Sequence, residues 1–123
     1  MILVDTAVWV DHFRKPEDEL MRLLDDEHVL SHPFVTGELA MGRFKDRESI
    51  LLMIQDQPPT CIAEDEEVVR FVTQNNLHGL GLSYIDAHLL VAVQLTPGAS
   101  IWTRDERLKK AAASLGISAL QLR

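Results

Sequence analysis

The sequence predicts an α/β fold, with a mostly parallel central sheet of four to five strands flanked by helices in a three-layer α/β/α arrangement. Short apolar runs recur along the chain, and longer segments of helical character separate them. Strands joined through helices run parallel, and the crossovers cover both faces of the sheet. With 123 residues, of which 46% are apolar and 25% charged, the chain is expected to form one domain, residues 1–123.

The predicted strands are the short apolar runs. Four of them are clear and the fifth is weaker. They cover residues 2–4, 29–30, 61–62 and 101–103, with the weaker run at residues 117–120.

The first three helices have start and stop signals in the sequence. Thr6 is a suitable N-cap for the first helix, and Pro16 ends it. A second helix is predicted over residues 17–26, where leucines fall on one face. A third is predicted to start near Pro33, because the fixed φ of proline suits a first turn, and it carries Glu38.

The later helices are predicted over residues 46–55, 64–76, 83–95 and 105–115. Ser83 and Asp86 have the spacing of a capping box at the start of the third of these. Gly116 stands where a helix commonly ends in the left-handed conformation, so it is expected to stop the last helix before the final strand.

Four acids are predicted to converge on one pocket. Asp5 directly follows the first strand, and Asp105 follows the fourth strand with only Arg104 between. The carboxyl ends of parallel strands meet at one edge, where ligands bind in open α/β sheets. Asp86 lies in the first turn of its helix, and Glu38 lies in a helix expected to emerge at the same rim.

Such a pocket suits a divalent metal ion. Neighbouring carboxylates repel one another unless protons or cations compensate their charge. Mg²⁺ and Mn²⁺ favour oxygen ligands, and no cluster of His and Cys in the sequence competes for that role.

Each acid also has a purely structural interpretation, and the residues alone leave both open. Asp86 would be a capping-box residue, and Asp105 would be the N-cap of the last helix. Glu38 would be a solvated helix residue. Asp5 is harder to explain in this way, because an acid that ends a buried strand needs a partner.

Four further polar residues are candidates for supporting roles. Thr6 and Thr103 would either cap helices or hydrogen-bond a ligating carboxylate, and we favour the second role for Thr103. Arg104 and Arg107 would either contact RNA phosphate at the pocket mouth or remain solvated.

Other residues that often carry chemistry are expected to be structural. The histidines would offer acid-base catalysis on an RNA 2′-hydroxyl, but their spacing does not support it, so each is expected at the surface or partly buried. Cys61 is predicted to be a small core residue, and both tryptophans are predicted to be core. The histidines are His12, His28, His32, His78 and His88, and the tryptophans are Trp9 and Trp102.

The formal charge of −7 disfavours broad electrostatic adhesion to nucleic acid, so any RNA contact has to be local. The same charge would suit a basic protein partner. No basic leader precedes Asp5 and no apolar run approaches the roughly 20 residues that cross a bilayer, so a cytoplasmic protein without a membrane partner is expected.

Taken together, these motifs resemble those of the PIN-domain nucleases, specifically the VapC-type toxins of type II toxin-antitoxin systems. The motifs are Ile-Leu-Val-Asp-Thr at residues 2–6, Glu38, Leu-Ser-Tyr-Ile-Asp-Ala at residues 82–87 and Trp-Thr-Arg-Asp-Glu-Arg-Leu at residues 102–108. The resemblance spans the whole chain. One departure is Ala7, where many relatives carry Ser or Asn, so a hydrogen bond from that position is absent.

The resemblance implies a PIN-like fold and a Mg²⁺- or Mn²⁺-dependent endoribonuclease whose ligands map onto Asp5, Glu38, Asp86 and Asp105. It also implies a homodimer held inactive by a cognate VapB-type antitoxin. That antitoxin would carry the DNA-binding region, so no direct DNA binding is expected without it.

Two other classes of function compete with this one. An aspartyl-phosphate phosphotransfer enzyme also places Asp after the first strand, but it usually needs a second Asp two residues on, where this chain has Ala7. A non-catalytic acidic module would only recognise a basic partner, and it predicts no dependence on divalent metal.

Overall fold

A parallel sheet of three strands organises the computed structural model, which describes residues 1–123. The strands are β1 (Ile2–Val4), β2 (Val29–Leu30) and β3 (Ser100–Trp102), and their order is β2-β1-β3. Ile2 pairs with both Val29 and Ser100. The central strand β1 is buried along its whole length, which agrees with its unbroken apolar sequence.

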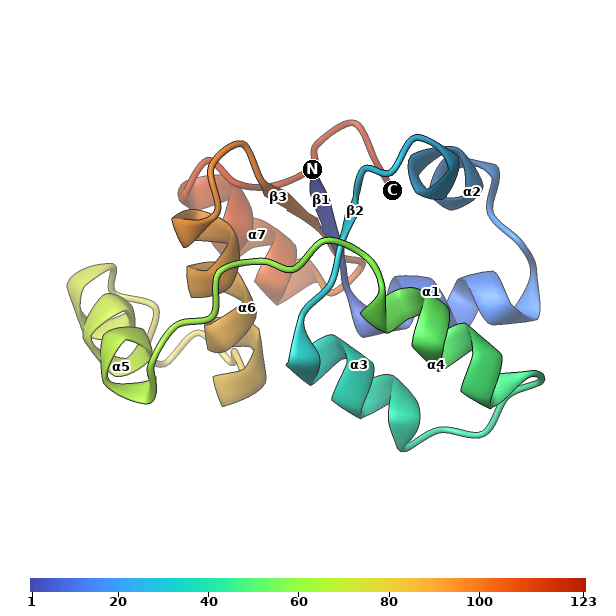
Figure 1. Cartoon of the computed structure of the whole chain (residues 1–123). Helices are drawn as coiled ribbons and strands as arrows, with labels where there is room; N and C mark the ends of the chain where they lie inside the picture. Colours follow the sequence, from blue (N-terminus) through green and yellow to red (C-terminus); the bar gives the residue numbers. More distant parts are fainter.

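Helices lie on both sides of this sheet. Figure 1 shows α1 to α4 on one side and α5, α6 and α7 on the other. Their bounds are α1 (Thr6–Arg14), α2 (Asp18–Asp25), α3 (Pro33–Ala40), α4 (Arg47–Gln55), α5 (Asp65–Gln74), α6 (Tyr84–Leu95) and α7 (Glu106–Ser114). The predicted α/β class and all seven predicted helices are therefore confirmed, with ends that differ by one or two residues.

Local signals explain several of these ends. Pro33 occupies the first turn of α3, and Ser83 and Asp86 form a complete capping box at the start of α6. Gly116 follows α7 with φ +74°, a conformation that costs glycine little. One expectation was wrong: Asp5, not Thr6, is the N-cap of α1, because its side chain accepts the Thr6 N–H.

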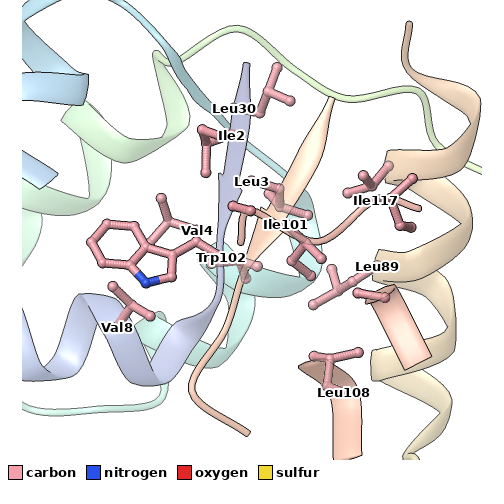
Figure 2. Close-up of a cluster of buried hydrophobic side chains, with 14 of the residues drawn as sticks. Ile2, Leu3, Val4, Val8, Leu30, Leu89, Ile101, Trp102, Leu108 and Ile117 are labelled. Atoms are coloured by element: carbon pink, nitrogen blue, oxygen red, sulfur yellow. The ribbon is translucent and has the colours of Figure 1, made fainter. Parts of the chain in front are cut away.

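The core lies between the sheet and the helices on either side of it. Figure 2 shows side chains of the three strands packed among residues from α6 and α7, including Leu89 and Leu108. Trp9 and Trp102 are both buried, as predicted. The indole N–H of Trp102 has no hydrogen-bond partner in this core.

The prediction of four to five strands is not confirmed. Around residues 61–62 the only pairing is a single bridge between Ser31 and Pro59. That bridge consists of the Ser31 N–H donating to the Pro58 carbonyl and the Thr60 N–H donating to the Ser31 carbonyl. The ladder goes no further because the chain after β2 enters α3 at Pro33, which has no N–H to donate. Near the C-terminus a single bridge joins Ile101 and Ser118, and the chain then turns back as the Leu122 N–H donates to the Ala119 carbonyl.

Three predictions of burial were also wrong. Cys61 is exposed, because it lies in the connection before α5 and not on a strand. His32 and His88 are buried, with exposed fractions of 2% and 3%. Both are placed by apolar surroundings that only tertiary packing creates, including the ring of Phe34, which lies against both.

Candidate active site

The candidate site lies at the carboxyl ends of β1 and β3. Asp5 follows β1, and its N–H donates to the Trp102 carbonyl at 2.9 Å, so the exits of the two strands are held in register. The chain places β2 on one side of β1 and β3 on the other. The crevice outside such a reversal is where open α/β sheets bind ligands. Figure 1 shows α1, α3 and α6 beginning at this same edge.

Asp5 is a buried carboxylate held by two donors. Its Oδ1 accepts the Thr6 N–H at 2.8 Å, and its Oδ2 accepts the Thr103 hydroxyl at 2.7 Å. Only 9% of its surface is exposed, and Thr103 is 3% exposed. Pairing Val4 with Trp102 puts the next residues, Asp5 and Thr103, side by side. The contact favoured for Thr103 from the sequence is therefore present.

The surroundings of Asp5 oppose its negative charge. Burial raises the pKa of the Asp5 carboxyl, the hydrogen bonds from Thr103 and Thr6 lower it, and the charges of Asp86 and Asp105 raise it again, for a net rise. The repulsion means that Asp86 and Asp105 lie within electrostatic reach of Asp5. A cation bound among them would relieve both the burial and the repulsion.

Glu38 reaches this centre through Thr6. The Thr6 hydroxyl donates to Glu38 Oε1 at 2.8 Å, while the Thr6 backbone N–H binds Asp5. Thr6 thus bridges the two carboxylates, with Glu38 exposed on α3 and Asp5 buried at the end of β1. The spatial convergence of these two acids, predicted from strand and helix order, is present in the structure.

Asp105 and Asp86 cap helices, and their charges also act on the Asp5 carboxyl. Asp105 Oδ1 accepts the N–H groups of Arg107 and Leu108 at 2.9 and 3.0 Å, and Asp86 Oδ2 accepts the Ser83 N–H at 3.1 Å. The structural interpretation of each acid is therefore correct. The capping role does not exclude a role in metal binding, because one oxygen of each carboxylate remains free. Neither Asp105 Oδ2 nor Asp86 Oδ1 has a hydrogen-bond partner in the protein.

No three His, Cys, Asp or Glu side chains anywhere in the chain stand close enough to form a ready-made metal site. The four acids therefore do not form a complete set of metal ligands in this structure. Mg²⁺ is commonly held by one or two carboxylates, with water and substrate phosphate completing the shell. The oxygen-only donor set and the repelled charge of Asp5 fit such an ion.

The two arginines proposed to contact RNA have different surroundings. Arg104 donates to Asp11 Oδ2 at 2.7 Å and to Glu17 Oε1 at 2.5 Å, and it lies over the Trp102 ring. An RNA phosphate would have to compete with both carboxylates for it. Arg107 is exposed and forms no ion pair, although its side chain packs against Gly81.

A second polar cluster contains none of the four acids and was not predicted. His88 Nε2 lies 3.0 Å from Asp65 Oδ1, which also accepts the Tyr84 hydroxyl at 2.8 Å. His32 Nδ1 accepts the Phe34 N–H, and burial, with a smaller effect of His88, lowers the pKa of His32 to about 4. The one signal in the sequence was the position of His32, just after a predicted strand.

The fold and the site define a class: α/β proteins with an acidic centre at the carboxyl edge of a parallel sheet. Comparison with known proteins identifies a family within this class. No protein-family model matches the chain, and no solved structure matches it significantly. Ribonuclease VapC32 of Mycobacterium tuberculosis strain CDC 1551 / Oshkosh is 42% identical over 118 residues, covering 96% of this chain and 95% of that protein. Ribonuclease VapC32 of strain ATCC 25618 / H37Rv matches with the same identity and coverage.

Identity at this level over nearly the whole length of both proteins shows the family. The chain belongs to the VapC-type ribonuclease toxins. The resemblance found in its motifs is therefore confirmed. No helix of the structure has both the length and the apolar character needed to cross a membrane.

Proposed function

We propose that this protein is a Mg²⁺- or Mn²⁺-dependent endoribonuclease that hydrolyses RNA phosphodiester bonds at the Asp5 centre. The observation that carries the proposal is the buried Asp5 carboxylate, whose charge is opposed by burial and by Asp86 and Asp105. Surroundings that oppose the uncompensated negative charge of Asp5 favour the binding of a cation to this carboxylate. Membership of a family of ribonucleases supports RNA as the substrate.

In this proposal Asp5 and Asp105 are the principal ligands. Asp86 would hold the ion directly or through water, and Glu38 would hold it or orient the attacking water. Thr103 and Thr6 hold the Asp5 carboxylate, and Thr6 also holds Glu38. When bound among these oxygens, a divalent ion would supply the positive charge that acidifies water and neutralises the phosphate.

The reaction follows from these roles. Water attacks phosphorus in line with the leaving 3′-oxygen, and the P–O3′ bond breaks. The products carry a 5′-phosphate and a 3′-hydroxyl. Because the 2′-hydroxyl is not the nucleophile, a 2′-deoxy sugar at the scissile position leaves considerable activity.

The family supports a toxin whose cognate VapB-type antitoxin blocks its activity. The −7 charge suits a basic segment of such a partner. We further propose a cytoplasmic homodimer that binds no DNA unless the antitoxin is present.

The experiment incubates the purified protein with structured RNA in Mg²⁺ or Mn²⁺ and then in EDTA. Cleavage that EDTA abolishes, with 5′-phosphate ends and activity on the 2′-deoxy substrate, is the expected result. A 2′,3′-cyclic phosphate product together with loss of activity on the 2′-deoxy substrate would contradict the mechanism. The absence of any cleavage would favour a non-catalytic binding module.

A further inference from the structure

A cleft of about 340 Å³ adjoins the acidic centre on the side of α1 and α3. Thr6 and Glu38, which hydrogen-bond each other, form part of its wall. Its volume lies in the range typical of small-ligand sites, roughly 300–1,000 Å³. A ligand in this cleft would lie next to the proposed site of cleavage.

The cleft carries unpaired positive charge in a protein with an excess of acids. Arg14, Arg43 and Lys45 line it, and Glu38 is its single acidic residue. None of the three cations forms a salt bridge or a side-chain hydrogen bond, and all three are exposed. The net charge of −7 disfavours broad adhesion to RNA, so a group of unpaired cations beside the acids offers a local contact.

The cleft is held in shape before any ligand binds. The ring of Phe44 stacks on Phe13 of α1, with centroids 4.5 Å apart and planes 19° apart. The guanidinium of Arg47 donates to the Ala40 carbonyl and ties the start of α4 to the end of α3. The connection that carries Arg43 and Lys45 is therefore fixed at both ends.

We infer that this cleft is a phosphate-binding subsite for the RNA strand, in which Arg14, Arg43 and Lys45 bind backbone phosphates next to the scissile bond. The inference rests on the proposed function and adds a positioning site to it. Arginine and lysine are the usual partners of RNA phosphates, and phosphate contacts set the position of a strand without reading its sequence. Binding here should therefore tolerate changes in RNA sequence.

The test measures how RNA binding depends on salt. It uses the full chain with Asp5→Asn, so that the RNA survives, and a short fluorescent single-stranded RNA as the probe. In this background Arg14→Gln with Arg43→Gln is compared with Arg22→Gln and Arg70→Gln. The control pair removes the same two charges from exposed positions on α2 and α5. Thermal melts check that each variant is folded.

The expected result is a smaller salt dependence for the cleft variant alone. Each phosphate contact on single-stranded nucleic acid contributes roughly 0.7 to the slope of log K against log salt, so losing two lowers its magnitude by about 1.4. In the parent sequence the cleft pair should also raise the KM for RNA more than it lowers kcat. Lys45→Gln should lower the slope by about half as much as the double change.

Equal slopes for the cleft pair and the control pair would overturn the subsite. The subsite would also be overturned if the cleft variant still binds RNA but no longer binds an antitoxin peptide. That result would assign the cleft to the protein partner. Cleavage by the parent protein is measured separately. If cleavage is intact while the slopes are equal, the subsite alone is wrong, whereas absence of metal-dependent cleavage refutes the proposed function.

Discussion

Replacing Thr103 by valine should weaken both the fold and the proposed active site. The Thr103 hydroxyl is buried, donates to Asp5 Oδ2 at 2.7 Å and accepts the Asp105 N–H at 3.1 Å. Valine has nearly the same shape but neither donates nor accepts. A hydrogen bond to a charged group contributes about 1.5–3 kcal/mol, so Thr103→Val should lower the free energy of unfolding by about 2 kcal/mol. For a domain of this size, that corresponds to a fall in Tm of roughly 6–10 °C.

The same change should affect cleavage more than a loss of stability explains. Without the Thr103 hydroxyl, the Asp5 carboxylate loses the donor that fixes its orientation. Removing a group that orients a metal ligand typically costs about 10–100-fold in metal affinity or activity. Thr103→Ser keeps the hydroxyl and is the matched control, so it should retain most of the activity.

Two assays read these effects separately. Urea unfolding in EDTA measures the stability without metal, and cleavage rates over a range of Mg²⁺ concentrations, well below Tm, measure the effect on the site. If Thr103→Val matches the parent protein in both assays, the Asp5–Thr103 contact has neither the structural nor the functional importance argued for it.

Two further predictions concern stability. The pKa of His32 is about 4 in the folded protein and about 6.5 in the unfolded chain, so the unfolded chain takes up a proton at a higher pH. The contribution of His32 to stability is therefore full above pH 6.5 and is lost as the pH falls from 6.5 towards 4. His32 should make the free energy of unfolding lower at pH 5 than at pH 7 by on the order of 1–2 kcal/mol. If His32→Asn shows the same difference between the two pH values as the parent protein, the assignment to His32 is wrong. Arg104→Met should cost about 1–2 kcal/mol in urea unfolding, because it leaves the partly buried Glu17 and the half-exposed Asp11 without their shared cation. Arg22→Met breaks only an exposed pair and should cost less than about 0.5 kcal/mol, so equal losses in the two variants would refute the reasoning.

Those parts of the fold that have local causes could be predicted from the sequence. The capping box of Ser83 and Asp86, the proline at the start of α3 and the glycine after α7 each act within a few residues, and all are present. The number of strands depends instead on whether distant segments pair. The start of α3 at Pro33 and the turn after Ala119 each limit that pairing to a single bridge, which no property of an isolated apolar run reveals.

The approach of Asp105 to Asp5 could be predicted from strand order. Asp5 and Asp105 follow strands that pair in parallel, so their convergence follows from topology. The hydrogen bond from the Thr6 hydroxyl to Glu38 matches one of the two roles predicted for Thr6, but the choice between them depends on the packing of α1 on α3. The structure also gives Asp86 and Asp105 a capping role without removing them from the reach of Asp5.

The basic cleft had no sequence signal. Arg14 and Arg43 are separated by 29 residues, and nothing in their spacing indicates that they line one cavity. Stacking of Phe13 on Phe44 brings the two segments together. The burial of His88 was missed for a similar reason, since the ring of Phe34 that lies against it comes from a distant part of the chain.

The central claim is that Asp5 is a metal ligand for RNA hydrolysis, and one comparison tests it most directly. Asp5→Asn keeps the N-cap of α1 and removes the charge, and Asp105→Asn removes a second proposed ligand. Asp26→Asn is the control, because Asp26 is exposed and lies before β2, at the opposite edge of the sheet. Since a catalytic metal contributes several kcal/mol, Mg²⁺-dependent cleavage should fall by at least about 100-fold in the first two folded variants and remain unchanged in the control. Cleavage at the parent rate by folded Asp5→Asn would contradict the account.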